Sequence, residues 1–253
     1  MSDSEVLYVG IEPNAGIMPL VFAAVNRQLE LIALKTGEID DVVDFLGKHE
    51  NVIAAINAPS GLNRGVVRSR LQSELSEQHQ LRGVDLRQAE FELKRRGVNI
   101  TGTPSHVDHC PAWMQAGFDL YKRLKELKFQ SYSNGSAGHK FLETNPHACF
   151  FMLLNRNPLP KQSLEGRLQR QMILHYCGLK ITDPMEFFEE LTSYKLLLGD
   201  LPMDMIFPAE HLDALAAAYV SWLTGNDSEQ LQKLGDPAEG EIYFPKPRFQ
   251  GHS

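Results

Sequence analysis

Hydrophobic residues recur along the chain with two different periods. Short runs rich in β-branched and aromatic residues predict buried strands at 6–11, 20–25, 52–56 and 140–144. Residues 29–35 alternate between the two faces of a strand, which predicts one more. Only short connections separate the first three strands. The chain is therefore expected to begin with an antiparallel meander.

Apolar residues spaced three and four apart mark the expected helices. These fall at about 39–46, 86–97, 111–127, 163–177, 184–198 and 212–223. The segment 60–139 is rich in Arg and Gln and carries two of them, so it is expected to be a long helical insert. We identify no domain boundary, and residues 1–253 are expected to form a single domain of which this insert is a part.

This order of elements predicts an α/β fold with a mixed sheet. Three antiparallel strands come first, and the fourth and fifth, which follow helical segments, are expected to lie parallel to the first and beside it. The predicted strand order is 3-2-1-4-5, with helices on both faces. That order is typical of an RNase H-like sheet.

Composition narrows the class of protein. Hydrophobic residues make up 43% of the chain and charged residues 23%, as in ordinary globular proteins. No apolar run approaches the roughly 20 residues that cross a bilayer. The first residues are acidic and polar, unlike a secretory signal, and the three cysteines have no CxxC pair. We expect free thiols, no membrane association and a cytoplasmic location.

Charge is unevenly distributed along the sequence. The net charge is −7, yet residues 64–170 carry 17 Lys/Arg against 10 Asp/Glu. This middle segment is the part that could attract a polyanion such as nucleic acid. It could equally be a solvated surface whose cations pair with the acidic flanks.

Polar side chains end three of the expected strands. Glu12 follows the first, Asn57 follows the fourth and Glu143 ends the fifth. Sites in open α/β sheets form beyond the carboxyl ends of parallel strands. If these strands are neighbours, the three side chains converge.

A fourth candidate, Asp213, lies in the last expected helix. Ala209, Ala216 and Ala217 flank it at helical spacing. Small residues let a helix lie close to a sheet, so the carboxylate is expected to face packed surface. A buried carboxylate has to be paired, protonated or bound to a cation.

Glu12, Glu143 and Asp213 in one pocket would repel one another. Mg²⁺ or Mn²⁺ would neutralise them, because hard cations prefer carboxylate oxygens, and such ions can activate water against a phosphodiester. Each residue also has a simpler explanation. Glu12 could be exposed and Asn57 could form a turn, while Glu143 could pair with Arg167 or Arg170. Asp213 could be a favourable acid near a helix N-terminus.

Several short motifs resemble the domain-of-unknown-function 429 family, whose members are predicted nucleases of RNase H-like fold. The matching pieces are GIE at 10–12, INAP at 56–59, ETNP at 143–146, GRLQR at 166–170, HLDALAAA at 211–218 and GEIYFP at 240–245. The chain departs from the family pattern at two positions, since Glu12 and Asn57 stand where Asp is usual. Asn57 brings an oxygen but no charge, which would weaken a two-metal site.

The resemblance implies a nuclease that uses Mg²⁺ or Mn²⁺ to hydrolyse nucleic acid with water. The implied catalytic residues and metal ligands are Glu12, Glu143 and Asp213, with Asn57 as an auxiliary ligand. Phosphate would be bound by Arg167 and Arg170 on one helix face and by Arg82 and Arg87 in the insert. The choice of DNA or RNA, and the oligomeric state, stay open.

Two other functions are compatible with the same sheet. One is a binding module that holds nucleic acid without cleaving it, which the uncharged Asn57 favours. The other is an actin-like or sugar-kinase-like phosphotransferase. Pro13-Asn14-Ala15-Gly16 fits poorly the Gly-rich, hydroxyl-bearing turn that such enzymes have after the first strand.

Overall fold

The computed structural model describes residues 6–14, 19–74, 85–134 and 138–249. One sheet forms its centre, in the order β3-β2-β1-β4-β6-β8-β7, with β5 beside β6. The strands are β1 (Leu7–Glu12), β2 (Leu20–Val25), β3 (Leu31–Gly37), β4 (Val52–Ile56), β5 (Gln130–Ser131), β6 (His139–Thr144), β7 (Leu231–Asp236) and β8 (Gly240–Pro245).

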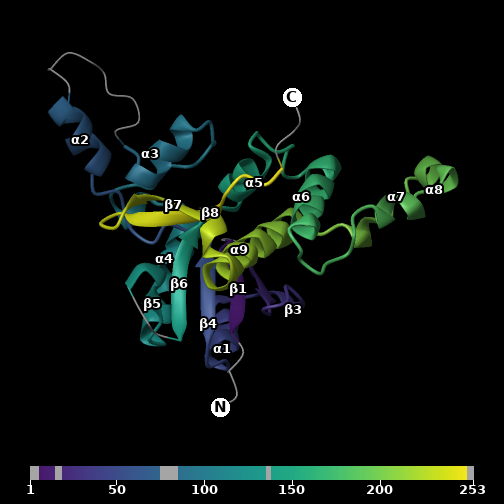
Figure 1. Cartoon of the computed structure of the whole chain (residues 1–253), viewed down its shortest axis with the longest axis horizontal. Helices are drawn as coiled ribbons and strands as arrows, with labels where there is room; N and C mark the ends of the chain where they lie inside the picture. The colour runs from purple at the N-terminus through teal and green to yellow at the C-terminus, as the bar shows by residue number, and fades with distance from the viewer. Residues whose placement is uncertain (1–5, 15–18, 75–84, 135–137, 250–253) are drawn as a thin grey trace.

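Helices surround the sheet (Figure 1). They are α1 (Ile39–Gly47), α2 (Val66–Glu74), α3 (Gln88–Arg95), α4 (Ala112–Glu126), α5 (Pro146–Leu154), α6 (Leu164–Tyr176), α7 (Glu186–Glu190), α8 (Ser193–Leu198) and α9 (Ala209–Asn226). Short 3₁₀ turns are η1 (Val107–His109), η2 (Tyr132–Asn134), η3 (Met203–Met205) and η4 (Ser228–Gln230). No helix in the described part of the chain is both long enough and apolar enough to span a bilayer.

The sheet mixes both strand directions, as the sequence predicts. Strands β1, β2 and β3 are antiparallel, and β4 and β6 continue the sheet parallel to β1. The prediction of an α/β fold with a mixed, helix-flanked sheet is confirmed.

The strand order differs from the predicted 3-2-1-4-5. Beyond β6 the sheet continues with β8, which is parallel to β6, and then β7, which is antiparallel to β8. The hydrophobic pattern missed both strands. No residue of β7 is fully buried, and β8 buries only its second half. A half-exposed edge strand carries little of the alternation on which strand prediction depends.

Two cores lie on opposite faces of the sheet. On one face α9, α5 and α6 pack over side chains of the central strands that include Tyr8, Ala55 and Leu142. On the other face α1 and α4 cover Ile11 and Ile56. Side chains at the carboxyl ends of β1, β4 and β6 therefore project from the sheet toward the helices that cover one face or the other.

The expected helix at 184–198 is two short helices. Thr192 breaks it, because its side chain accepts a hydrogen bond from Lys195 N at 3.1 Å and so caps α8. The segment 60–139 carries α2, α3 and α4, of which the pattern predicted the last two. Helix α5 was also missed.

Helix α9 lies unusually close to β1 at Gly10. A Cβ built on Gly10 would stand 2.0 Å from the Ala214 carbonyl oxygen and 2.1 Å from Ala218 N. Only glycine leaves room for helix backbone at this distance, and the alanines of α9 complete the contact. The close approach fixes the height of α9, and with it Asp213, above the end of β1.

Gly10→Ala should destabilise the protein. The added methyl group meets helix backbone that cannot rotate away, and overpacking of this kind costs about 1–3 kcal/mol or more. Chemical denaturation measures the loss. Gly47→Ala is the matched control, since a Cβ there meets nothing within 4 Å. Equal stability of the two variants would contradict the close contact.

Candidate functional site

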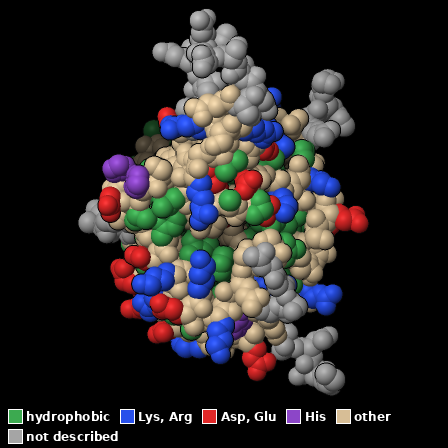
Figure 2. All heavy atoms as spheres, turned by 90° about the vertical axis from the view of Figure 1, so that its left-hand side faces the viewer, with side chains coloured by type: hydrophobic (Ala, Val, Ile, Leu, Met, Phe, Trp, Pro, Cys, Tyr) green, Lys and Arg blue, Asp and Glu red, His purple; other side chains and the backbone are tan. Residues whose placement is uncertain are grey.

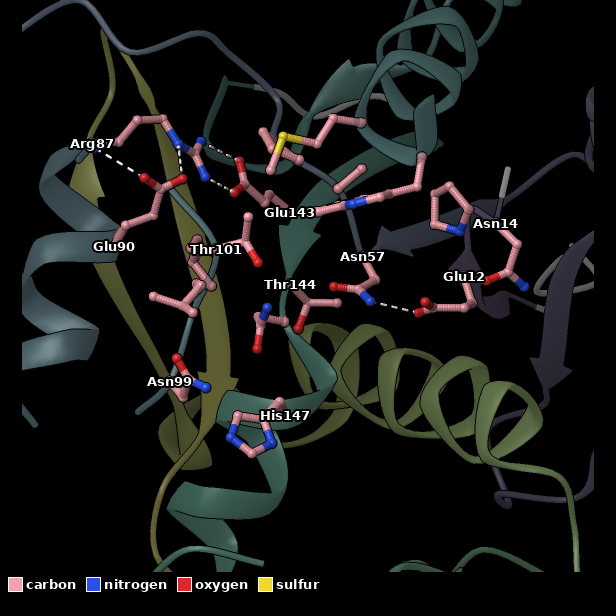
Figure 3. Close-up of a pocket in the computed structure, with 18 of the residues that line it drawn as sticks. Glu12, Asn14, Asn57, Arg87, Glu90, Asn99, Thr101, Glu143, Thr144 and His147 are labelled. Atoms are coloured by element: carbon pink, nitrogen blue, oxygen red, sulfur yellow. Dashed lines mark hydrogen bonds and ion pairs between the residues drawn. The ribbon is translucent and has the colours of Figure 1, made fainter. Parts of the chain in front are cut away.

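A cavity of about 570 Å³ opens at the carboxyl ends of β1, β4 and β6. Glu12, Asn57 and Glu143 line it, as their positions at strand ends predict. Trp113 from α4 and His147 from α5 lie in its walls. Figure 3 shows Glu12 with Asn57 at one end of the cavity and Glu143 with Arg87 at the other.

The register of the sheet separates Glu143 from the other two side chains. Ile11 pairs with Ile56, and Ile56 pairs with Glu143. Successive side chains of a strand point to opposite faces, so Glu143 leaves the sheet on the face of Ile11 and Ile56. Glu12 and Asn57 are each one residue further along their strands and point to the other face. The three groups share a cavity without meeting at one point.

Both oxygens of Glu143 are held by the protein. Arg87 forms two parallel bonds to it, from Nη2 to Oε1 at 2.5 Å and from Nη1 to Oε2 at 3.0 Å. Ser60 adds its backbone N–H at 2.7 Å and its hydroxyl at 2.8 Å, both to Oε2. A carboxylate bound in this way is neutralised and fully hydrogen-bonded.

Arg87 connects β6 to two other segments of the chain. Its Nε donates to Glu90 Oε1 at 2.8 Å, and its Nη1 donates to the Glu239 carbonyl at 3.0 Å. The Glu239 carboxylate accepts from the backbone N–H of Arg64 at 2.8 Å and of Gln88 at 2.9 Å, and so stabilises the starts of α2 and α3. Arg87 and Glu239 thereby attach the insert to the sheet.

Glu12 has a very different environment. Within the part of the chain that the structure describes, its carboxylate accepts one hydrogen bond, from Asn57 Nδ2 at 2.6 Å to Oε2. Burial, and after it the nearby Asp213 carboxylate, raise the pKa of Glu12 to about 8 against the opposing effect of Lys161. Glu12 is therefore mostly protonated at neutral pH unless a cation stands beside it.

Asp213 lies next to Glu12 on the α9 side. It is 5% exposed and forms an ion pair with Lys161 Nζ. Burial raises the pKa of Asp213 although Lys161 opposes this. Burial alone would lower the pKa of Lys161, but the charges of Asp213 and Glu12 outweigh the effect of burial and raise this pKa. One ammonium thus serves two buried carboxylates.

The arginines expected to bind phosphate are mostly engaged elsewhere. Arg170 is buried and donates from Nη1 to the carbonyls of Leu159 and Gly166, both at 2.9 Å. Arg167 contacts the Met203 sulfur at 4.0 Å, away from the cavity lining. Arg82 lies outside the described residues. Of the three arginines that the structure describes, only Arg87 lines the cavity, and its guanidinium is bonded to the carboxylates of Glu90 and Glu143.

A divalent cation fits part of the expected ligand set. Glu12, Asp213 and the Asn57 oxygen are hard donors, and in Figure 3 that oxygen points away from Glu12 into the cavity. Glu143 does not fit, because its oxygens are occupied. Among the residues that the structure describes, no three His, Cys, Asp or Glu side chains are grouped to hold a metal ion. The four-residue set is therefore not brought together.

Sequence reasoning missed the groups that neutralise the acids. Lys161 lies in a loop between α5 and α6, and no pattern around it indicates a site. The sequence analysis predicts Arg87 as a phosphate ligand, although Glu90 three residues later indicates an internal ion pair. His147 also lines the cavity, and its pKa is lowered by burial and then by Arg170 and Lys161.

Arg87→Met should severely destabilise the fold. It would leave Glu143 and Glu90 buried without a cation, and removing one partner of a buried ion pair costs about 3–5 kcal/mol. The free energy of unfolding in urea measures this. Arg95→Met, at an exposed position of α3, is the control and should change stability little. A small effect at Arg87 would mean that the network carries little of the stability.

Glu12→Gln should gain stability relative to the wild type as pH rises. The folded-state pKa of Glu12 is about 8, above the ordinary glutamate value of 4.5, so the folded protein holds this proton more tightly than the unfolded chain. The free energy of unfolding therefore falls as pH rises from about 4.5 to 8, then levels off. Glutamine has no such proton to lose.

Denaturation at several pH values in the presence of a chelator tests this. A stability difference between Glu12→Gln and wild type that is constant from pH 5 to 8 would show that Glu12 has an ordinary pKa.

Comparison with known proteins identifies the family and little more. No curated protein and no solved structure matches the chain. One family model does match, over residues 14–239, and its description is "Protein of unknown function (DUF429)". This range includes Asn57, Glu143 and Asp213, and it covers most of the sheet and of the helices around it. The chain belongs to the DUF429 family.

Proposed function

We propose that the protein is a divalent-metal-dependent nuclease with an RNase H-like sheet. The observation that supports this best is the buried pair of Glu12 and Asp213. Their mutual repulsion raises the pKa of Glu12, with burial, to about 8, so a cation at this position would be bound strongly. The cavity in front of Glu12 gives a phosphodiester access to it.

Glu12, Asp213 and Asn57 would hold one Mg²⁺ or Mn²⁺. When bound, such an ion stabilises negative charge on phosphate oxygens and makes water more acidic. Glu143 is a structural residue in this proposal, in contrast to the ligand role that the sequence suggested. The proposal therefore involves a single ion rather than a pair.

Three further residues would contact the substrate or the attacking water. Lys161 is 37% exposed along its side chain, so its ammonium can leave Asp213 and neutralise a phosphate oxygen. His147 has a lowered pKa and is neutral at pH 7, so a ring nitrogen can accept the proton of an attacking water. Trp113 offers an aromatic surface for a base in the same cavity.

A second candidate function is binding of nucleic acid without cleavage. The observation that favours it is internal neutralisation, because Lys161 already pairs with Asp213 and Arg87 with Glu143. A site whose charges are matched within the chain needs no metal ion. A single assay of metal-dependent cleavage distinguishes the two functions.

Asp213→Asn should abolish metal-dependent cleavage. Labelled single- and double-stranded DNA and RNA are incubated with the protein in Mn²⁺ or Mg²⁺, and we expect the variant to be slower by roughly 100-fold or more, because a bound metal contributes several kcal/mol. Asp119→Asn makes the same change at an exposed site of α4 and should cleave like wild type. Circular dichroism checks that both are folded.

The outcomes separate the proposals. Unchanged cleavage by folded Asp213→Asn would reject the assignment of this residue as a ligand. Gel shifts without cleavage in either metal would favour the binding module, and absence of both would reject both functions. Glu143→Gln adds a control, since we expect its lost activity to follow its lost folded fraction.

A further inference from the structure

Residues 183–204 form a projection that we call the arm. It comprises α7, α8 and η3 and extends away from the sheet (Figure 1). Its surface is unusually apolar, since Leu197 is 83% exposed and Tyr194 is 70% exposed. The other large exposed hydrophobic side chains of the arm are Met185, Phe188, Leu196, Leu198 and Met203. A concentration of large exposed apolar side chains on one projection is typical of an interaction site.

The arm has a small core of its own. Phe187 is buried against Leu168 of α6 and Ile206, and Leu191 and Leu201 pack around them. Thr192 caps the start of α8, and Gly199 ends it with a φ of 72°. The leucines of α8 are thus held outward on an ordered base, and they do not fold back onto it.

The arm is also strongly acidic. Between residues 183 and 204 the sequence has six Asp/Glu and one Lys, a net charge of −5. Two arms placed against each other would juxtapose these charges, which opposes a symmetric contact between arms. The partner surface should be apolar and basic.

A groove with those properties lies between α2 and α3. Its cavity is about 690 Å³. Val67, Leu71 and Phe91 give it an apolar lining, and Arg95 and Arg96 line its edge. The segments 64–72 and 85–97 together carry seven Lys/Arg and three Asp/Glu, a net charge of +4.

The groove also has an unsatisfied polar atom. Gln88 is 6% exposed and lines the groove, and its Oε1 is buried without a hydrogen-bond partner within the described structure. An unpaired buried acceptor costs about 1–3 kcal/mol, which a donor on an incoming segment would recover. The exposed Tyr194 hydroxyl of the arm is such a donor.

The arm and the groove lie at opposite ends of the molecule. In Figure 1 α7 and α8 extend to the right, whereas α2 and α3 lie at the upper left. Figure 2 views that left-hand side and shows Lys and Arg side chains among hydrophobic ones. The arm cannot reach the groove of its own chain without a large rearrangement.

We propose that the arm of one copy docks into the α2–α3 groove of a second copy. The contact brings together two apolar surfaces and places the arm, with a net charge of −5, against groove segments with a net charge of +4. It also gives the unpaired Gln88 Oε1 a donor in the Tyr194 hydroxyl. Because it joins two different surfaces, each added copy leaves one arm and one groove open, so the assembly is a ring or a filament. This inference does not depend on the nuclease proposal.

Analytical ultracentrifugation of the full chain tests the proposal with two variants. Leu197→Asp alters the arm at a side chain that is 83% exposed, and Arg95→Glu with Arg96→Glu alters the groove at exposed positions. Both should fold. We expect wild type to associate beyond dimers at roughly micromolar concentration, less strongly at 500 mM than at 50 mM NaCl. Each variant should weaken association at least tenfold.

Mixing the two variants is the decisive measurement. The arm variant keeps an intact groove and the groove variant keeps an intact arm, so an equal mixture should form 1:1 dimers and nothing larger. Glu165→Gln, an exposed change on α6 outside both surfaces, should associate like wild type.

Three results would overturn the proposal. Wild type could stay monomeric up to about 100 μM. The groove variant could associate as strongly as wild type, which would indicate contacts between arms. The mixture could stay monomeric although wild type associates. If wild type is monomeric and only the groove variant loses binding to nucleic acid, the groove is a nucleic-acid surface instead.

Discussion

The contact between Gly10 and the backbone of α9 determines the arrangement of the site. Ala214 and Ala218 approach β1 so closely that no side chain fits between them. Asp213, next to this contact in the helix, is consequently held near Glu12 at the end of the strand, and both side chains are buried. The unusual pKa of Glu12 follows from this packing, because burial is its largest cause.

The protein neutralises its buried carboxylates in two ways, and the difference separates structure from function. Glu143 receives a bidentate arginine, a backbone N–H and a hydroxyl, which leaves it little to offer a ligand. Glu12 and Asp213 share one lysine from a loop. Folding stability alone would favour a complete set of partners at both places. Glu12, one of the two carboxylates with an incomplete set, lines the cavity, where a cation or substrate could complete the set.

Sequence patterns predicted the helix-flanked mixed sheet and the proximity of Glu12 to Asn57. They also placed Asp213 against the sheet, since the alanines around it indicated close packing. They did not predict that Glu143 leaves the sheet on the face opposite to Glu12 and Asn57. A shift of one residue in register reverses the face of a side chain, and register depends on pairing between distant strands. They missed Lys161 because a loop position shows no periodicity, and β7 because an edge strand alternates weakly.

Charge counted along the sequence also overstated the positive surface available to a polyanion. Arg87 and Arg170 belong to the basic middle segment, yet both are buried and bonded within the chain. Among the described residues, exposed cations such as Arg95 and Arg96 remain on α3, whereas the acidic, apolar arm lies at the far end. Unequal charge along the sequence thus becomes a polarity of the folded molecule. Both ends of the molecule carry apolar surface, but their charges are opposite. Association of unlike ends is therefore favoured, because like ends repel each other.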